Sequence, residues 1–204
     1  GEITALYAAE VLSFEECVSL IKIRSELMSS AVKGSMAALI GFKIEELRKL
    51  VDALDDVVIA NDNSSSQVVL SGKREELENL SKIISCKRFI FLNVSGAFHS
   101  HFMREPSQKF SKYLDDLNFK EPIFPVISIS NPTICSDSNE LKNRLKDQMC
   151  NGVRWRETMD LIKMQGDSIH LVEIGPSNVL GGLAKRHLKN TMISQVSSSK
   201  EISY

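Results

Sequence analysis

Residues 34–94 alternate short apolar runs with two amphipathic segments, and this order restricts the possible folds more than any other feature of the sequence. In 42–54 and 73–86 the apolar residues recur at helical spacing, which predicts two helices. The other apolar runs are short and bounded by polar residues, which predicts strands, with a turn over 61–66. These runs are 35–41, 55–62, 66–72 and 87–94. The resulting order, β-α-β-β-α-β, is typical of a ferredoxin-like unit.

The sequence on either side of this unit alternates helical patterns with apolar strand patterns. The helical segments are 3–11, 14–31, 102–117, 138–151, 154–166 and 177–189, and the strands are 125–130 and 169–175. Ser13 and Glu16 form the capping-box pattern that marks the start of a helix. Alternation of this kind predicts an α/β fold with a mostly parallel sheet covered by helices on both faces. We therefore expect a larger domain of residues 1–33 and 95–204, interrupted by a subdomain of residues 34–94.

Length and charge narrow the class of protein further. With 204 residues the chain is long enough for one large domain with a smaller one inserted. The net charge of −1 gives no reason to expect nucleic acid as a partner, and the sequence has no apolar stretch of about 18 residues that would span a membrane. The four cysteines lie singly, which favours neither a zinc site nor a disulfide framework and indicates a reducing compartment.

His99 stands out because it follows the apolar run 88–94 and lies among small residues, in the stretch VSGAFHS. Histidine has a reference pKa of about 6.5, so a side chain placed there suits proton transfer near neutral pH. A single histidine is more often a hydrogen-bonded structural residue, and the residue alone does not decide between the two roles.

Four ordered motifs together are more specific than any one residue. They are GSMAALIG (34–41), ANDNSSSQVVLSG (60–72), GAFHS (96–100) and VEIGPSNVLGGLAKR (172–186). In order and spacing they resemble the malonyl-CoA:acyl carrier protein transacylases of fatty acid synthesis, and the resemblance runs from Gly1 to about His187. It implies a larger α/β-hydrolase-like domain with the ferredoxin-like subdomain inserted, and an active site between the two.

The resemblance implies acyl transfer through a seryl ester, from malonyl-CoA to the phosphopantetheine thiol of acyl carrier protein. The family's serine lies in a Gly-His-Ser-Leu-Gly-Glu turn, and Gly1 and Glu2 resemble its last two residues. On this alignment we expect the serine two positions before Gly1, so this chain alone should be inactive. We further expect no metal or redox cofactor, a monomer, and a cytoplasmic location, or a plastid or mitochondrial one if a transit peptide lay upstream.

The family's catalytic residues match particular positions in this sequence. His99 matches the histidine that takes the serine proton. Gln148 begins a match to the pattern Gln-x-x-x-Pro-Val-x-Trp, where a backbone carbonyl beside the glutamine orients that histidine. Gly152 replaces the proline of the pattern, which predicts a looser turn. Without the resemblance, Gln148 has the pattern of an ordinary solvated helix residue.

Contacts with the substrate are also implied by the resemblance. Arg24 matches the arginine that clamps the free carboxylate of the malonyl group, a task suited to the two parallel donors of a guanidinium. Phe98 matches a bulky residue that admits malonyl and crowds methylmalonyl. Asn61 and Asn63 match an Asn-x-Asn pair at the border of the interdomain cleft, although asparagine is equally suited to a turn. Taken alone, Arg24 has the pattern of a surface arginine and Phe98 that of a core residue.

Two other functions fit the same motifs. Because the sequence does not contain the expected serine, a non-catalytic fragment that binds CoA or carrier protein is one alternative. The presence of both His99 and Arg24 disfavours it, since a pure binding module needs no proton acceptor. An acyltransferase domain of a polyketide synthase is the other alternative, and from the short tail after His187 we expect a free-standing enzyme instead.

Overall fold

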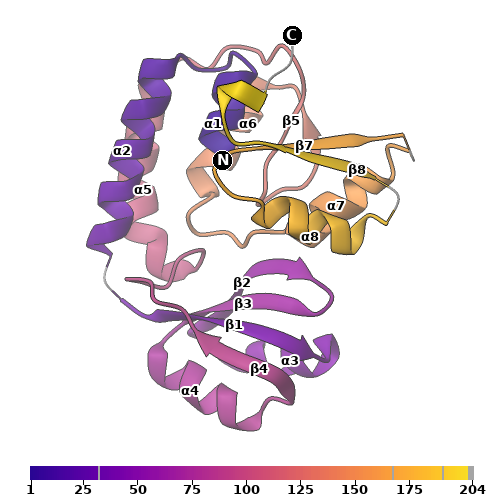
Figure 1. The fold of residues 1–204 in the computed structure, drawn as a ribbon. Coiled ribbons are helices and arrows are strands. Elements are labelled where there is room, and N and C mark those ends of the chain that lie inside the picture. The colour runs from indigo at the N-terminus through magenta and orange to yellow at the C-terminus, as the bar shows by residue number, and fades with distance from the viewer. Residues whose placement is uncertain (32, 167, 190, 202–204) are drawn as a thin grey trace.

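Some of the helices pack side by side in one part of the molecule (Figure 1). The computed structural model describes residues 1–31, 33–166, 168–189 and 191–201, so residues 32, 167, 190 and 202–204 of the predicted larger domain lie outside the described residues. The packed helices are α1 (Glu2–Ala8), α2 (Phe14–Ser30), α5 (Arg104–Asp115) and α6 (Ser138–Asp147). Their apolar core includes the fully buried side chains of Leu6, Leu20, Phe110, Leu114, Leu141 and Leu145. Packing of these side chains stabilises the helices, since isolated helices of this length are marginal in water.

The start of α2 is fixed by the capping box that the sequence predicts. The Ser13 hydroxyl accepts a hydrogen bond from the Glu16 backbone N–H at 3.2 Å, and the Glu16 carboxylate accepts one from the Ser13 backbone N–H at 2.8 Å. The prediction is confirmed. Because the cap sets where α2 begins, it also sets the position of Arg24 further along the same helix.

The ferredoxin-like unit has the element order that the sequence predicts. Its elements are β1 (Ser35–Phe42), α3 (Ile44–Val51), β2 (Val57–Ser64), β3 (Gln67–Gly72), α4 (Arg74–Ile83) and β4 (Cys86–Phe91). The strands form an antiparallel sheet in the order β2-β3-β1-β4, and α3 and α4 cover one face of it (Figure 1). Its apolar core includes Leu39, Leu47, Leu70, Leu77 and Leu80.

The connection between β2 and β3 is shorter than expected. The sequence predicts a turn over 61–66, but β2 continues to Ser64 and only the next two residues form the turn. The pairing of β2 with β3 is irregular at Ile59/Asn61 and at Asp62/Ser64, which accommodates the polar residues within the strand. The extended part of β2 contacts a loop far away in the sequence, so local composition does not reveal it.

The rest of the chain forms two short ladders, where the sequence predicts one mostly parallel sheet. The strands are β5 (Val126–Ile127), β6 (Ile134–Cys135), β7 (His170–Ile174) and β8 (Met192–Val196). β5 pairs antiparallel with β6, and β7 pairs parallel with β8, so the α/β class is confirmed while the single sheet does not form within the described ranges. The segment 128–133 between β5 and β6 is too short for the crossover that parallel strands need. α8 (Val179–His187) provides such a crossover between β7 and β8.

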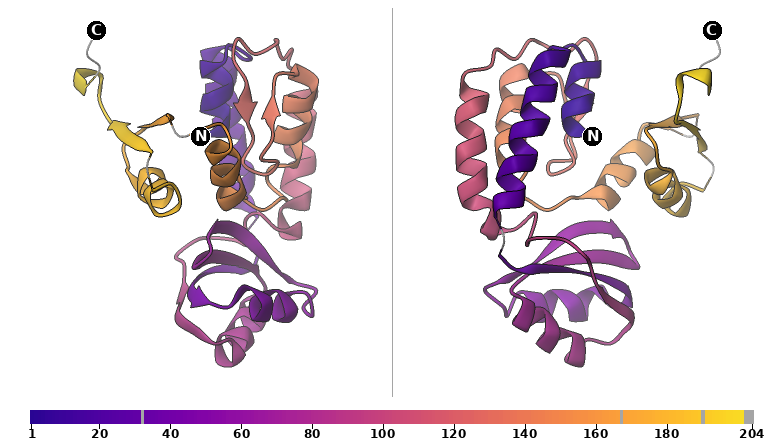
Figure 2. Two further views of the ribbon diagram at one scale, coloured as in Figure 1. Left: turned by 90° about the vertical axis from the view of Figure 1, so that its right-hand side faces the viewer. Right: turned by 60° about the vertical axis from the view of Figure 1, so that its left-hand side comes forward.

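Figure 2 shows that β7, β8 and α8 lie beside the packed helices and are joined to them through α7 (Trp155–Lys163). The N-terminus lies on the side of the helices that faces this part. β2 of the ferredoxin-like unit contacts both α7 and α8. The division into a domain of residues 1–33 and 95–204 and another of 34–94 stays a prediction. No helix among the described residues is both long and apolar enough to cross a bilayer.

Candidate active site

His99 lies between β4 and α5, on the segment that leads from the ferredoxin-like unit back to the helices. Its φ angle is 57°, in the left-handed region that residues other than glycine seldom adopt. The ring atom Nδ1 lies 3.2 Å from the backbone carbonyl oxygen of Gln148 and 3.0 Å from that of Asn151. Because carbonyl oxygens only accept hydrogen bonds, Nδ1 carries the ring proton and Nε2 keeps a free lone pair. His99 can therefore take up a proton at Nε2.

The surroundings of His99 favour its neutral form. Burial lowers its pKa from the usual value of 6.5, and the positive charge of Arg24 lowers it further. The backbone carbonyls of Asn151 and Gln148 act in the opposite direction without reversing the shift. The proton-accepting form of His99 therefore persists to more acidic pH than it would in an exposed histidine.

Gln148 connects His99 to Arg24. Its backbone carbonyl contacts His99 Nδ1, and its side-chain Oε1 accepts a hydrogen bond from Arg24 Nη2 at 2.7 Å. Gln148 is only 9% exposed, so it is not the solvated helix residue that its local sequence resembles. Arg24 forms no ion pair within the part of the chain that the structure describes. The other N–H groups of its guanidinium are therefore available to an anionic ligand.

Arg24 and Gln148 line a cavity of about 220 Å³. The rest of its lining consists of Gly1, Glu2, Ile3, Ile21, Ser25 and Leu145. His99 is not part of the lining and is connected to the cavity through the carbonyl of Gln148.

Glu2 places a carboxyl group in the lining of this cavity. The sequence predicts no role for it, apart from its match to the last residue of the family's serine turn. Burial raises the pKa of its carboxyl group, an effect that Ser128, the Ile129 backbone and the charge of Arg24 partly offset. Glu2 Oε2 and Ser128 Oγ are both buried, and neither has a hydrogen-bond partner of normal geometry among the described residues. Burial also lowers the pKa of Arg24, and Glu2 partly offsets this shift. The acid and the cation therefore stabilise each other's charged forms.

Asn151 is a second contributor that the sequence does not single out. It contacts His99 through its backbone carbonyl, a group that every residue carries, so its side chain gives no signal for the role. The available sequence signal is indirect, because Asn151 lies inside the stretch 148–155 that matches the family pattern as a whole.

The structure does not bring Phe98, Asn61 or Asn63 into the cavity beside Arg24. Phe98 is partly buried and packs against two apolar clusters, one among the helices and one on β1, β2 and β3. Asn61 and Asn63 lie within β2, and Asn61 forms a parallel bridge with Val153. The roles of these three residues in substrate binding therefore stay predictions.

Gly152 stands where the family pattern has proline, and its turn lies against β2. A Cβ atom at this position would lie 2.8 Å from the backbone oxygen of Ile59. Beside it, the Val153 N–H donates to the Ala60 oxygen at 2.7 Å, and the Val153 oxygen accepts from the Asp62 N–H at 2.8 Å. The turn is bonded to β2, and glycine permits the close approach. That the turn is looser than one with proline stays a prediction.

We expect Gly152→Ala to lower the free energy of unfolding by about 1–3 kcal/mol, because the added methyl group has to displace the backbone of β2. Gly182→Ala is the matched control, since no atom outside its own helix lies within 4 Å of the corresponding Cβ position in α8. Alanine is also the better helix former there. Urea denaturation measures both variants. A Gly152→Ala protein as stable as the unsubstituted one would show that the loop can move away from β2 without lowering the free energy of unfolding.

The sequence profile of the acyl transferase domain matches residues 1–201. The malonyl CoA-acyl carrier protein transacylase of Synechocystis sp. is 43% identical over 186 residues, which cover 91% of this chain. The same alignment covers 63% of the Synechocystis protein, so the chain spans less than two thirds of the length of this relative.

Solved structures of similar proteins have the same fold. The crystal structure of the malonyl-CoA:ACP transacylase of Synechocystis sp. has a TM-score of 0.94 at 40% identity, covering 98% of this chain and 68% of that one. A type II polyketide synthase acyl carrier protein in complex with its malonyl-transacylase has a TM-score of 0.90 at 32% identity, covering 98% of this chain and 67% of that one. The described fold is therefore the one found in these transacylase structures.

Proposed function

The chain belongs to the acyl transferase domain family, and we propose that it supplies the proton acceptor and the substrate clamp of a malonyl-CoA:acyl carrier protein transacylase. The observation that carries the proposal is the link through Gln148, whose carbonyl oxygen contacts His99 and whose amide oxygen accepts from Arg24. A base and a cation held by one residue suit a reaction in which a proton moves beside a bound carboxylate.

In the first half-reaction a serine oxygen attacks the thioester carbonyl of malonyl-CoA while His99 Nε2 accepts the hydroxyl proton. The carbon–sulfur bond breaks, and CoA leaves as the thiol with the proton that His99 returns, so that malonate remains as a seryl ester. The phosphopantetheine thiol of acyl carrier protein then attacks this ester. His99 takes the thiol proton and passes it to the serine oxygen as the carbon–oxygen bond breaks. We expect the serine in the family's Gly-His-Ser-Leu-Gly-Glu turn, whose end Gly1 and Glu2 resemble.

Arg24 selects the acyl group in this mechanism. Its guanidinium is oriented by Gln148, and its remaining N–H groups can donate two parallel hydrogen bonds to the free carboxylate of the malonyl group. An acetyl group has no carboxylate, so its binding leaves the remaining N–H groups of a partly buried guanidinium without acceptors, which costs free energy. We therefore expect a preference for malonyl over acetyl.

Partners and location complete the proposal. Both half-reactions consist of proton and acyl transfers, which the serine, His99 and Arg24 can carry, so we expect no metal or redox cofactor. The partners are malonyl-CoA and acyl carrier protein, the protein acts as a monomer, and neither nucleic acid nor a membrane takes part. We place it in the cytoplasm, with a plastid or a mitochondrion as alternatives, in fatty acid synthesis.

The test is covalent labelling of the full-length protein with radiolabelled malonyl-CoA. We expect a malonyl adduct on a serine, located by mass spectrometry of peptides, and transfer of the label to acyl carrier protein. We expect no adduct on a polypeptide limited to the 204 residues of this chain. A full-length protein that binds malonyl-CoA without forming an adduct would support the alternative of a non-catalytic module for CoA or carrier protein.

Acyl transfer in polyketide synthesis is a second candidate, favoured by the similarity to the type II polyketide synthase complex. The site and the chemistry are the same, and the difference lies in the carrier protein that accepts the malonyl group. Comparing kcat/KM for carrier proteins of fatty acid and of polyketide synthesis decides between the two.

We expect Phe98→Leu to raise methylmalonyl transfer relative to malonyl transfer by about tenfold, since one methyl group in an apolar pocket is worth about 1–3 kcal/mol. The smaller side chain gives the α-methyl branch room that the phenylalanine ring denies. Competition between the two CoA esters, with the acylated carrier protein read by mass spectrometry, measures the ratio. Phe98 also packs against two apolar clusters, so thermal unfolding is the control. An unchanged ratio in a stable variant would assign Phe98 to the core alone.

A further inference from the structure

The loop between α6 and α7 contacts His99 near its start and the ferredoxin-like unit near its end. The backbone carbonyls of Gln148 and Asn151 accept from His99 Nδ1. Two residues after Asn151, Val153 makes two backbone hydrogen bonds to β2, of 2.7 and 2.8 Å. A short stretch of backbone therefore connects the imidazole of His99 to the edge of the ferredoxin-like sheet.

β2 is shaped to meet this loop. Its pairing with β3 is irregular at Ile59/Asn61 and at Asp62/Ser64, close to the contact with the loop. Such bulges bend a strand and interrupt its ladder. Gly152 lets the loop approach until a Cβ atom at its position would lie 2.8 Å from the Ile59 oxygen. The contact therefore extends over several residues of β2.

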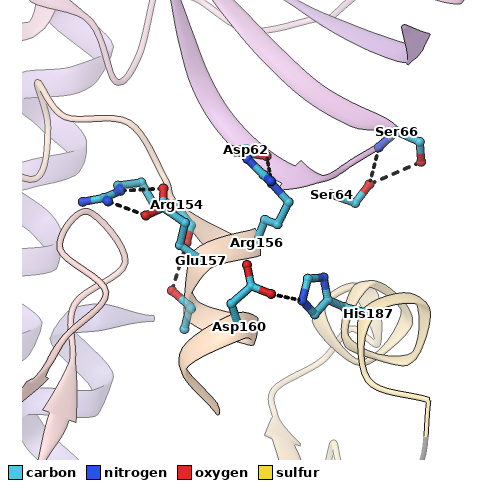
Figure 3. A network of polar contacts seen from close by, with 9 residues as sticks. Asp62, Ser64, Ser66, Arg154, Arg156, Glu157, Asp160 and His187 are labelled. Carbon is cyan, nitrogen blue, oxygen red and sulfur yellow. Dashed lines mark hydrogen bonds and ion pairs between the residues drawn. The ribbon is translucent and has the colours of Figure 1, made fainter. Parts of the chain in front are cut away.

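An ion pair holds the same junction together. Arg156, in the first turn of α7, donates to both carboxylate oxygens of Asp62, with two Nε–Oδ distances of 3.1 Å and an Nη2–Oδ2 distance of 2.6 Å (Figure 3). Their side chains are 29% and 16% exposed, so water screens this pair less than a surface pair. The pair also raises the pKa of Arg156. Arg154, by contrast, is the N-cap residue of α7, pairs with Glu157 in the first turn of that helix and points away from Asp62 (Figure 3).

The orientation of His99 depends on this loop. Among the described residues, the hydrogen bonds of its imidazole are those to Gln148 and Asn151. An imidazole without such acceptors exchanges its proton between its two nitrogens, and a proton on Nε2 removes the lone pair that accepts the serine proton. A displacement of about 1 Å at a catalytic group can cost roughly 100-fold in rate. The position of the loop therefore decides how well His99 can act as a base.

We propose that strand β2 positions His99, and that Asp62 and Arg156 are positioning residues for the proton transfer. The ion pair holds the loop against β2, and the two carbonyls of the loop fix the ring orientation and the Nδ1–H tautomer of His99. Neither Asp62 nor Arg156 touches the substrate. The kinetic consequence rests on the proposed function, whereas the state of the imidazole does not.

The test replaces Arg156 by glutamine in the full-length protein, with Arg154→Gln, at the N-cap of the same helix, as the matched control. Nitrogen-15 NMR of the imidazole rings reports the tautomer of each histidine, and the His99 signals are assigned by their loss in His99→Asn. We expect the Nε2–H tautomer of His99 to become populated in Arg156→Gln and to stay undetected in Arg154→Gln. His170 on β7, which is bonded to Ser194 at 2.7 Å, serves as the internal reference.

The kinetic measurement separates positioning from substrate binding. We expect the kcat of Arg156→Gln to fall by about 10-fold to 100-fold, with little change in the KM for malonyl-CoA because Arg24 is untouched. Arg154→Gln should keep the kcat of the unsubstituted protein. Arg156→Lys keeps the charge without the bidentate geometry, so we expect an intermediate loss of kcat. The same variant serves as the test if Arg156→Gln does not fold.

An unchanged His99 tautomer and an unchanged kcat in folded Arg156→Gln or Arg156→Lys would overturn the inference and leave the ion pair a purely stabilising contact. Absence of malonyl transfer in the unsubstituted full-length protein would refute the proposed function instead. The tautomer measurement would then still test whether β2 positions His99.

Discussion

Arg24→Ala in the full-length protein should lower malonyl transfer by about 3 kcal/mol in kcat/KM, or roughly 150-fold, while acetyl transfer rises. The guanidinium is partly buried and oriented by Gln148, and it forms no ion pair in the described part of the chain. Its free donors are therefore available to the malonyl carboxylate. Acetyl-CoA cannot satisfy these donors, so removing the cation also removes the cost of leaving it unpaired.

The measurement is kcat/KM for malonyl-CoA and for acetyl-CoA with the same carrier protein. Lys22→Ala is the control, since Lys22 lies on the same helix and is exposed. Arg24→Lys tests the geometry, because an ammonium group keeps the charge without the two parallel donors and should restore only part of the malonyl preference. A malonyl-to-acetyl ratio that is the same in Arg24→Ala and Lys22→Ala would remove Arg24 from substrate recognition.

The parts of the fold that depend on neighbouring residues could be predicted from the sequence. The capping box of Ser13 and Glu16 involves residues only three positions apart, and it forms as expected. The order of the ferredoxin-like unit follows from apolar spacing within each helix and strand, and its six elements form in that order. In both cases the physical cause lies within a short window of sequence.

The parts that depend on distant residues could not be predicted. β2 continues past Asn61 because Val153 bonds to its backbone and Arg156 binds Asp62, although the local composition indicates a turn. Neither β6 nor β8 is evident from the sequence. A two-residue strand such as β6 has no period to detect, and Met192–Val196 lacks strict alternation.

The candidate site shows the same division. The family resemblance points to His99, Arg24 and Gln148, and the structure connects them through the backbone and the side chain of Gln148. Asn151 contacts His99 only through its backbone carbonyl, so the identity of its side chain does not predict the contact. The ion pair between β2 and α7 joins residues that only the fold brings together. The motifs therefore lead to His99, Arg24 and Gln148, whose contacts the structure describes, but not to the backbone carbonyl and the ion pair around them. Phe98, Asn61 and Asn63, which the motifs also name, do not line the cavity beside Arg24.

His99→Asn in the full-length protein should lower kcat by about 100-fold to 10,000-fold, the range that a general base contributes. Asparagine is chosen because it tolerates the left-handed backbone at this position, where φ is 57°, and does not titrate. The KM for malonyl-CoA should change little, since the bond between Arg24 and Gln148 remains. Thermal unfolding of the variant is the control for a change in stability.

The pH dependence of the same variant decides whether His99 is the base. Burial and the charge of Arg24 lower the pKa of His99, so kcat/KM of the unsubstituted protein should rise with pH along a limb whose midpoint lies below the usual 6.5. In Arg24→Ala the repulsion between the two cations is gone, and the midpoint should move to higher pH. The limb reports loss of a proton from His99, so it should be absent from the residual activity of His99→Asn. A limb that persists there would assign the proton transfer to another group and leave His99 a structural residue.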